Sequence, residues 1–339
     1  MDISLNAHNH DQFLEQFPLS SFLQSRFWKR FLSLLDKKYW QLNVYDDNRL
    51  LAHCLIYTNK LIMGKSYLYS PKGPLIIPDL DESHRKEALE LILSQVRDIT
   101  IATRKREEVF CRIEPNIQVA GLASLPMKPA DSVQPKTTIY LRLDTSPEEL
   151  FAAFQEKTRY NIRLAEKKQL NIVWANDDTA LNYFLQLLNK TKSRQRIRSH
   201  DKKYYRLLLE AGREFDAVQI NYALFQGKPI AANIYITQIP TVTYVHGGFD
   251  YAYRNLMAPY LLQWDAIQRA IALKYDFYDF WGYLPSDGSK PSWEGFSRFK
   301  AGFSGTVVES PGCFDFIYNQ VWYNAYERFQ SMRSKIHGS

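Results

Sequence analysis

Lys300 is the residue whose type and setting most suggest chemistry. It stands in the run Phe299-Lys300-Ala301-Gly302-Phe303. Aromatic residues on both sides would hold this segment in place, and glycine lets another backbone approach closely, so we expect a β-strand here. A fixed cation can stabilise the negative charge that develops on a carbonyl oxygen during acyl transfer. A lone lysine is more often a surface residue, so this role depends on the segments around it.

Acidic residues near this run do not include a clear general base. Asp276, Asp279 and Glu294 are each at least as well suited to structural roles. An amine that attacks an activated ester needs little base assistance, because positioning can supply much of the rate enhancement. A mechanism that depends on positioning and on Lys300 is therefore chemically reasonable.

A first basic segment lies at residues 157–168. Arg159, Arg163 and Lys167 follow one another at a spacing of four, and Lys157 precedes them. On a helix this spacing forms a basic stripe that suits an RNA backbone. A solvated, charged helix explains the same residues equally well.

A second basic segment, residues 190–198, carries five cations in nine residues. Arginine can bind two phosphate oxygens at once through its planar fork. A run of this kind is ordinarily a solvated loop, so phosphate binding here needs support from elsewhere in the chain.

The elements that would position these groups follow the order strand, loop, helix, strand. Residues 243–245 predict a strand that runs into Gly247-Gly248, and a loop with Arg254 and Pro259 follows. A helix over 260–274 has apolar residues at helical spacing, and an aromatic strand over 277–281 comes next. This order is the core of a GNAT-type acyltransferase.

The first half of the chain repeats this plan, which indicates internal duplication of an α/β unit. We expect a mixed α/β protein with two GNAT-like acyltransferase domains packed around a cleft. The first domain would span residues 1–145 and be completed by a C-terminal helical segment at 308–339. The second would span residues 146–307.

Composition sets the broad class of the protein. The chain has 339 residues, enough for two domains with apolar cores. The net charge of +7 favours an anionic partner. Three widely spaced cysteines (Cys54, Cys111 and Cys313) suggest buried thiols, with no disulfide framework or metal site. We expect a cytoplasmic protein, because the sequence shows neither a signal peptide nor a long apolar run.

The combined pattern R-x4-P, LLQW, YDF-x-G and FK-x-GF resembles the Fem family of peptidoglycan bridge-forming aminoacyltransferases. The resemblance implies transfer of an amino acid from aminoacyl-tRNA, as co-substrate, to an amino group of a muramyl stem peptide carried on UDP or on a lipid. It implies no metal and no organic cofactor. It also favours the compact members, because no sustained heptad marks an inserted helical arm.

The resemblance assigns roles to individual residues. Lys300 and Asp279 would be catalytic. The substrate-binding residues would be Gln24, Trp28, Lys29, Tyr69, Lys72, Arg194, Arg196, Tyr204, Tyr244 and Arg254. The RNA-binding residues would be Lys157, Arg159, Arg163 and Lys167. The choice of a diphosphate ligand among Arg194, Arg196 and Arg198 stays open.

A coenzyme A donor is disfavoured. Such a donor needs a glycine-rich loop before the central helix, whose backbone amides hold the pyrophosphate. The segment from Arg254 to Pro259 keeps the arginine but lacks the glycines. Two alternatives remain: an acyl-CoA-dependent N-acyltransferase on the same fold, and a non-catalytic protein that binds RNA or a wall precursor.

Several properties are left open or weakly indicated. The sequence does not specify the amino acid transferred or a soluble versus lipid-linked acceptor. We expect a monomer with no stable binding to DNA, no transmembrane segment and at most a peripheral membrane contact.

Overall fold

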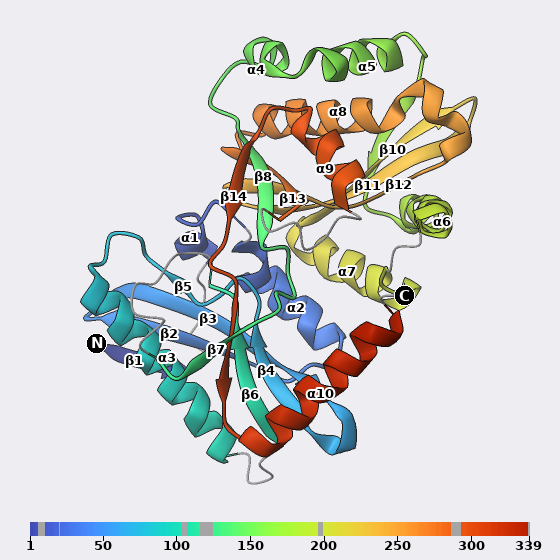
Figure 1. Cartoon of the computed structure of the whole chain (residues 1–339). Helices are drawn as coiled ribbons and strands as arrows, with labels where there is room; N and C mark the ends of the chain where they lie inside the picture. Colours follow the sequence, from blue (N-terminus) through green and yellow to red (C-terminus); the bar gives the residue numbers. More distant parts are fainter. Residues whose placement is uncertain are drawn as a thin grey trace. The chain divides into compact units, whose positions relative to one another are not determined.

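The computed structural model describes residues 1–5, 11–19, 21–102, 107–115, 125–195, 199–285 and 293–337 (Figure 1). The chain divides into two compact units. Unit 1 comprises Met1–Phe13, Asp36–Gln134 and Ser310–Ser339, and unit 2 comprises Leu14–Leu35 and Pro135–Glu309.

This division differs from the expected domains in two places. The stretch Leu14–Leu35 belongs with unit 2, since the apolar face of α2 (Arg26–Leu34) packs on α7 (Lys202–Phe215). The boundary also lies earlier than residue 145, because β8 (Thr137–Arg142) is an interior strand of the unit 2 sheet.

Unit 1 contains an eight-stranded mixed sheet in the order β1-β2-β3-β4-β6-β15-β7, with β5 paired to β3. The strands are β1 (Asp2–Leu5), β2 (Tyr39–Asp46), β3 (Arg49–Lys60), β4 (Ser66–Ser70), β5 (Leu75–Ile76), β6 (Glu108–Ile113), β7 (Met127–Ala130) and β15 (Cys313–Ile317). The helical elements assigned wholly to this unit are a 3-10 turn η2 (Ile62–Gly64), α3 (Glu82–Ala102) and α10 (Gln320–His337); the short α1 (Asp11–Leu14) spans the division. The three cysteines are buried here and unpaired with one another.

Unit 2 contains a seven-stranded mixed sheet in the order β14-β8-β13-β12-β11-β10-β9. Besides β8, its strands are β9 (Asn171–Ala175), β10 (Val218–Phe225), β11 (Lys228–Gln238), β12 (Thr241–Phe249), β13 (Phe277–Gly282) and β14 (Thr306–Glu309). The other helical elements are two 3-10 helices, η1 (Ser21–Gln24) and η4 (Tyr251–Leu256), and α4 (Pro147–Ala153), α5 (Glu156–Glu166), α6 (Asp178–Gln195), α8 (Ala258–Ala272) and α9 (Glu294–Ala301).

The two sheets share one plan, which confirms the expected mixed α/β fold. In each, three antiparallel strands (β2-β3-β4 and β10-β11-β12) lead through a crossover helix (α3 and α8) to a parallel neighbour (β6 and β13). An antiparallel strand then pairs with that neighbour, β15 in unit 1 and β8 in unit 2. The unit 1 sheet is thus completed from the C-terminal part of the chain.

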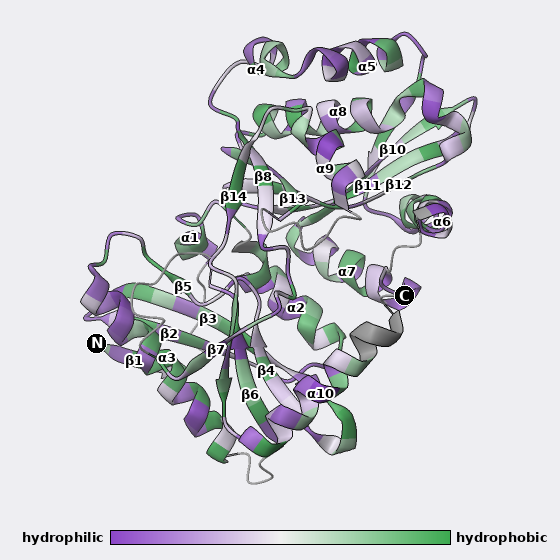
Figure 2. Ribbon diagram, viewed as in Figure 1, coloured by the Kyte–Doolittle hydropathy of each residue, from purple (hydrophilic) through white to green (hydrophobic). Residues whose placement is uncertain are grey.

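Local sequence explains these elements. Strand residues alternate or run apolar, and one face of α3 packs on its sheet through Ala88, Leu89 and Ile92 (Figure 2). Ser146 and Glu149 form a capping box at the start of α4. Gln226 and Gly227 both take positive φ in the turn between β10 and β11, as a tight two-residue hairpin turn requires.

Three expectations about secondary structure are wrong. The expected strand around Lys300 is instead the end of a helix, since Phe299 and Lys300 belong to α9, which begins at Glu294. Residues 147–168, which their sequence predicts to be one helical stretch, form two helices, α4 and α5, that are separated at Phe154 and Gln155. The C-terminal segment provides β15 before α10. Within the described residues, no helix is long and apolar enough to cross a membrane.

Candidate active site

Lys300 is a buried residue of unit 2, with 7% of its surface exposed. Its Nζ donates hydrogen bonds to the backbone carbonyl oxygens of Gly282, at 2.6 Å, and Trp281, at 3.4 Å. The same atom lies 4.9 Å from the ring centre of Phe296. Burial lowers the pKa of Lys300 to about 7, and the negative charge of Asp279 partly opposes that shift. Lys300 can therefore exist as an ammonium or as an amine near neutral pH.

The end of β13 is shaped to present these two carbonyl groups. Trp281 has a φ of +58°, a value that is strained for a tryptophan. The Oδ1 atom of Asp279 accepts a hydrogen bond from the Trp281 backbone N–H at 2.8 Å and another from the hydroxyl of Thr138. The pairing of β13 with β8 shifts register between Asp279 and Gly282. Asp279 thus fixes the bend that places the carbonyls against Lys300.

Asp279 has no exposed surface. The resemblance assigned it a catalytic role as a carboxylate that reaches the cleft. Because its side chain is fully buried, we assign it a positioning role: it supports the bend of β13 and the charge of Lys300.

A cavity of about 440 Å³ opens beside Lys300. It is lined by residues of α6, α7, β12 and α9 and of the segment before α7: Leu188, Thr191, Ser199, His200, Tyr205, Tyr244, Val245, His246, Gly247, Phe296, Phe299 and Lys300. Among these described lining residues, Lys300 is the one lysine or arginine. Tyr244, a predicted substrate contact, lies here with its ring centre 5.6 Å from the lysine Nζ.

Two histidines form an aromatic wall of this cavity. His200 stacks on Tyr204 at 3.6 Å between ring centres, and His246 contacts Tyr205 edge to face at 5.2 Å. Burial, with a smaller contribution from His200, lowers the pKa of His246 to about 3. Burial also lowers the pKa of His200. Both rings are therefore neutral near pH 7, and Lys300 supplies the titratable cation.

Two of the predicted substrate contacts near the N-terminus, Gln24 and Trp28, lie in the core of unit 2. Gln24 is 2% exposed and Trp28 is 7% exposed. The Trp28 ring packs on Phe31 at 4.9 Å, and Phe31 packs on Tyr204 at 5.0 Å. Lys29 is half-buried on the same helix. Trp28 therefore supports, through Phe31, the Tyr204 ring on which His200 stacks.

Two predicted substrate-binding arginines meet at a different place on unit 2. The guanidinium carbons of Arg194 and Arg254 lie 4.5 Å and 4.6 Å from the ring centre of Tyr251. Both arginines are exposed. Arg196 and the competing Arg198 lie outside the described residues.

Tyr69 and Lys72 lie in unit 1, beside a buried carboxylate. The hydroxyl of Tyr69 donates to Glu114 at 2.5 Å, and the backbone N–H groups of Val133 and Gln134 donate to the same carboxylate at 2.6 and 3.0 Å. Burial raises the pKa of Glu114, and the charge of Lys72 opposes that shift. Glu114 was not among the predicted site residues, although its place directly after a buried strand was a usable signal.

The basic stripe of α5 is partly structural. Arg159 donates to the backbone carbonyl oxygens of Ala152, at 3.0 Å, and Phe154. Lys157, Arg163 and Lys167 are exposed. The N-terminal end of α5 is joined to α9, because the backbone N–H of Gln155 donates to the Gly302 carbonyl at 2.9 Å. The exposed cations therefore lie on a helix fixed to the Lys300 segment.

The predicted site residues did not include His200, Tyr205 or His246, which form the aromatic wall of the cavity. Tyr205 shares the buried face of α7 with Leu208, Leu209 and Gly212 at helical spacing. Periodicity therefore predicts that Tyr205 points inward, although Tyr204 was the predicted substrate contact. His246 follows Tyr244 on β12 across an irregularity in the pairing, since the two residues pair with the adjacent Tyr235 and Ile234 of β11. Strand alternation therefore gave no signal for His246.

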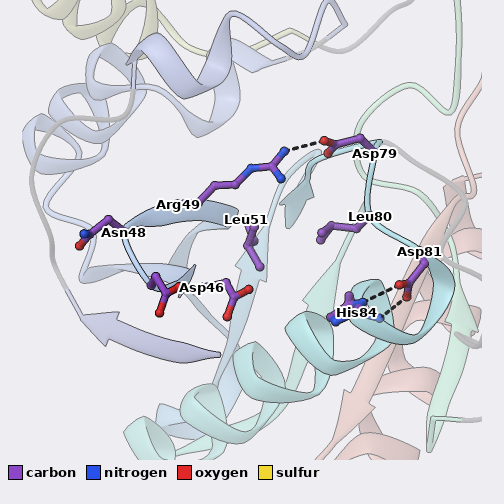
Figure 3. Close-up of a pocket in the computed structure, with 9 residues that line it drawn as sticks. Asp46, Asn48, Arg49, Leu51, Asp79, Leu80, Asp81 and His84 are labelled. Atoms are coloured by element: carbon purple, nitrogen blue, oxygen red, sulfur yellow. Dashed lines mark hydrogen bonds and ion pairs between the residues drawn. The ribbon is translucent and has the colours of Figure 1, made fainter.

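Unit 1 has a separate surface hollow between the β2–β3 turn and the start of α3 (Figure 3). Arg49 pairs with Asp79 at 2.5 Å, and His84 pairs with Asp81 at 2.6 Å. These side chains are more than half exposed, and ion pairs of this kind contribute little. We assign the hollow no catalytic role.

In comparisons with known proteins, the model of the FemAB family matches this chain over residues 5–125, 120–220 and 213–331. The chain is 31% identical over 140 residues to the aminoacyltransferase FemB of Staphylococcus epidermidis, covering 40% of this chain and 31% of FemB. It is 21% identical over 249 residues to a lipid II:glycine glycyltransferase of Staphylococcus haemolyticus, covering 68% of this chain and 57% of that enzyme. The chain therefore spans roughly one third to just over half of these relatives.

Solved structures share the fold. A crystal structure of FemX has a TM-score of 0.82 at 18% identity, covering 96% of this chain and 99% of FemX. A tandem GNAT protein from the clavulanic acid biosynthesis pathway has a TM-score of 0.52 at 11% identity, covering 93% of this chain and 98% of that protein.

Proposed function

The chain belongs to the FemAB family, and on this premise we propose that it is an aminoacyltransferase of peptidoglycan bridge formation. The donor is an aminoacyl-tRNA, and the acceptor is the amino group of a muramyl stem peptide. The names of the FemB and glycyltransferase relatives support the reaction class. No metal or organic cofactor takes part.

The observation that carries this proposal is the buried Lys300 at the wall of a cavity. Its Nζ is held by two backbone carbonyl groups, and its pKa of about 7 lets it give up a proton near neutral pH. The aromatic wall of Tyr205, His200 and His246 carries no charge near pH 7, so Lys300 is the charged group beside it. A cation in such a site interacts strongly with a developing negative charge.

The chemical step follows from this placement. The acceptor amine attacks the ester carbonyl carbon, a C–N bond forms and the carbonyl electron pair moves to oxygen. Lys300 stabilises that oxyanion as an ammonium. When the C–O bond to the ribose breaks, Lys300 gives its proton to the leaving ribose oxygen, and the proton lost by the attacking nitrogen restores the ammonium. The products are an amide and a deacylated tRNA.

The RNA part of the donor has a candidate surface on α5. Lys157, Arg163 and Lys167 are exposed there, and the helix is bonded to the segment that follows Lys300. Arg159 contributes indirectly, because its guanidinium holds the carbonyl groups between α4 and α5.

We also keep the acceptor contacts as proposals. Arg194 and Arg254 suit phosphate groups because both are exposed and lie together on Tyr251. Tyr69 and Lys72 contribute from unit 1, next to Glu114. Trp28 acts by supporting Tyr204 through Phe31, and Gln24 and Lys29 stay proposed substrate contacts from the same segment.

A transfer assay tests the proposal. The protein is incubated with a mixture of charged tRNAs and with muramyl pentapeptide on UDP or on a lipid, and the precursors are examined by mass spectrometry. We expect an aminoacyl adduct on one precursor that disappears when the tRNA is deacylated beforehand. No adduct on any precursor, together with saturable binding of coenzyme A by calorimetry, would favour an acyl-CoA donor instead.

A further inference from the structure

The turn between β3 and β4 in unit 1 presents two large apolar side chains to solvent. Ile62 is 55% exposed and Met63 is 78% exposed, and the turn is coloured as hydrophobic in Figure 2. Hydrogen bonds from Leu61 N to Lys65 O, at 2.7 Å, and from Lys65 N to Ile62 O, at 3.1 Å, close the turn. Met63 takes a left-handed φ of +56° at its tip. The apolar tip is therefore held in a defined shape.

An apolar groove of about 440 Å³ continues from this turn to α10. Leu61 and Ile62 line one side, and Trp322, Tyr326 and Phe329 line the other. Phe329 is 45% exposed, and Met332, three residues further along the helix, is 59% exposed. The turn and one face of α10 thus form a continuous apolar surface, which we call the tip–α10 face.

Cations border the tip–α10 face. Lys60 and Lys65 bracket the turn, and the Lys65 Nζ lies 5.1 Å from the ring centre of Trp322. Lys37 is close enough to Lys60 that the second charge lowers the pKa of Lys37, after the larger effect of burial. Glu327 of α10 is paired with Lys128 at 2.6 Å. Like charges held close together favour an anionic partner.

We propose that the tip–α10 face docks on the surface of an anionic phospholipid bilayer. Ile62 and Met63 insert at headgroup level, Phe329 and Met332 lie at the interface, and Lys60 and Lys65 pair with lipid phosphates. Apolar insertion and a cationic rim are each weak signals for membrane binding and become effective together. A second copy of the chain fits less well, because a two-fold contact through this face would bring lysines against lysines.

Vesicle sedimentation with the full chain tests this proposal. Vesicles of phosphatidylcholine alone are compared with vesicles of phosphatidylcholine and phosphatidylglycerol in equal parts. We expect the wild type to sediment with the anionic vesicles and to be released by added salt. Ile62→Asp with Met63→Asp should lower the partition coefficient by about tenfold or more. Aspartate tolerates a left-handed backbone, so the turn keeps its shape.

Matched variants separate the two signals. Lys60→Glu with Lys65→Glu should remove the preference for phosphatidylglycerol. Leu273→Asp changes an equally exposed apolar residue of unit 2, 57% exposed, and should bind like the wild type. Thermal melts confirm that each variant is folded.

Clear results would overturn the proposal. These are no binding of the wild type to anionic vesicles, wild-type binding by the Ile62→Asp, Met63→Asp variant, or an equal loss in Leu273→Asp. A dimer in sedimentation velocity that the double variant abolishes would assign this face to self-association instead.

Discussion

The Nζ atom of Lys300 lies 2.6 Å from the backbone carbonyl oxygen of Gly282 and donates a hydrogen bond to it. That carbonyl follows the strained Trp281, whose backbone N–H is held by Asp279. The bend at the end of β13 therefore holds Lys300 of α9 in place through the Gly282 carbonyl group. Because carbonyl dipoles stabilise an ammonium while burial opposes it, this arrangement can poise Lys300 between its two protonation states.

The first prediction concerns stability and pH. Burial lowers the pKa of Lys300 from 10.5 to about 7 in the folded protein. Between these values the unfolded chain binds more protons, so this residue makes the free energy of unfolding rise with pH. Lys300→Met should lose that contribution. The measurement is urea unfolding of both proteins between about pH 7 and pH 8.5.

That pH range avoids other titrations. Burial raises the pKa of Cys54 to about 12 and the pKa of Tyr235 further, so these groups reduce stability at higher pH. They are common to both proteins and cancel in the difference. A difference between wild type and variant that does not change with pH would show that Lys300 keeps an ordinary pKa.

The second prediction concerns Gly302. A Cβ atom at this position would lie 2.2 Å from the Thr158 hydroxyl oxygen but 3.6 Å from the Thr158 Cβ. Gly302→Ala should therefore lower the free energy of unfolding by about 1–3 kcal/mol. Adding Thr158→Ala should recover part of that loss, since the clashing oxygen is removed. Chemical denaturation of the single and double variants measures the coupling.

Gly295→Ala is the matched control. Gly295 lies in α9, which Gly302 directly follows, and a Cβ at Gly295 meets no atom within 4 Å. This variant should be neutral or slightly stabilising, because alanine favours a helix. Equal destabilisation by both alanines would contradict the close contact between α5 and α9.

The third prediction concerns the buried ion pair that joins β15 to β6 within unit 1. Arg112 contacts both carboxylate oxygens of Asp315 at 2.7 Å, and the hydroxyl of Tyr323 donates to the same carboxylate at 2.9 Å. Asp315→Asn should cost about 3–5 kcal/mol, since it leaves a buried guanidinium without its counter-charge. Urea unfolding measures this cost.

Glu327→Gln provides the comparison for that variant. Glu327 forms a surface pair with Lys128 at 2.6 Å, and both side chains are at least 40% exposed. Its loss should cost about 1 kcal/mol or less. Similar costs for the two variants would mean that the Arg112–Asp315 pair is not buried as the structure places it.

The sequence predicted the order of the elements around Lys300 better than it predicted how that residue is held. Hydrophobic periodicity and glycine breaks indicated the duplicated plan from local residues alone. The helical state of Lys300 and the bend at Trp281 depend on tertiary contacts with Asp279, Thr138 and Gly282. Periodicity carries no information on such contacts between distant segments.

Tyr204 and Tyr205 illustrate the same limit at the site. A motif match selected Tyr204, while the structure places Tyr205 at the cavity and Tyr204 behind His200. Which of the two tyrosine rings faces the cavity is determined by contacts with distant segments, and adjacent residues in the sequence do not reveal it. The partners of Glu114 likewise come from residues 69, 133 and 134, a set that no local pattern brings together.

The fourth prediction concerns RNA binding by α5. Changing Lys157, Arg163 and Lys167 to glutamine, one at a time, should weaken tRNA binding and reduce the slope of log K against log salt by about one for each phosphate that is no longer neutralised. Lys274→Gln, an exposed lysine after α8, is the control. Filter binding at several salt concentrations measures the slope, and unchanged slopes in all three variants would remove α5 from the donor site.

The fifth prediction tests the central claim, which is that Lys300 promotes aminoacyl transfer. The measurement is the single-turnover rate of transfer from charged tRNA to a muramyl pentapeptide by the wild type, Lys300→Met and Lys274→Met. We predict that Lys300→Met transfers about a hundred- to a thousandfold more slowly, with unchanged affinity for tRNA and precursor, while Lys274→Met keeps the wild-type rate. Transfer by a folded Lys300→Met variant at the wild-type rate would contradict the account.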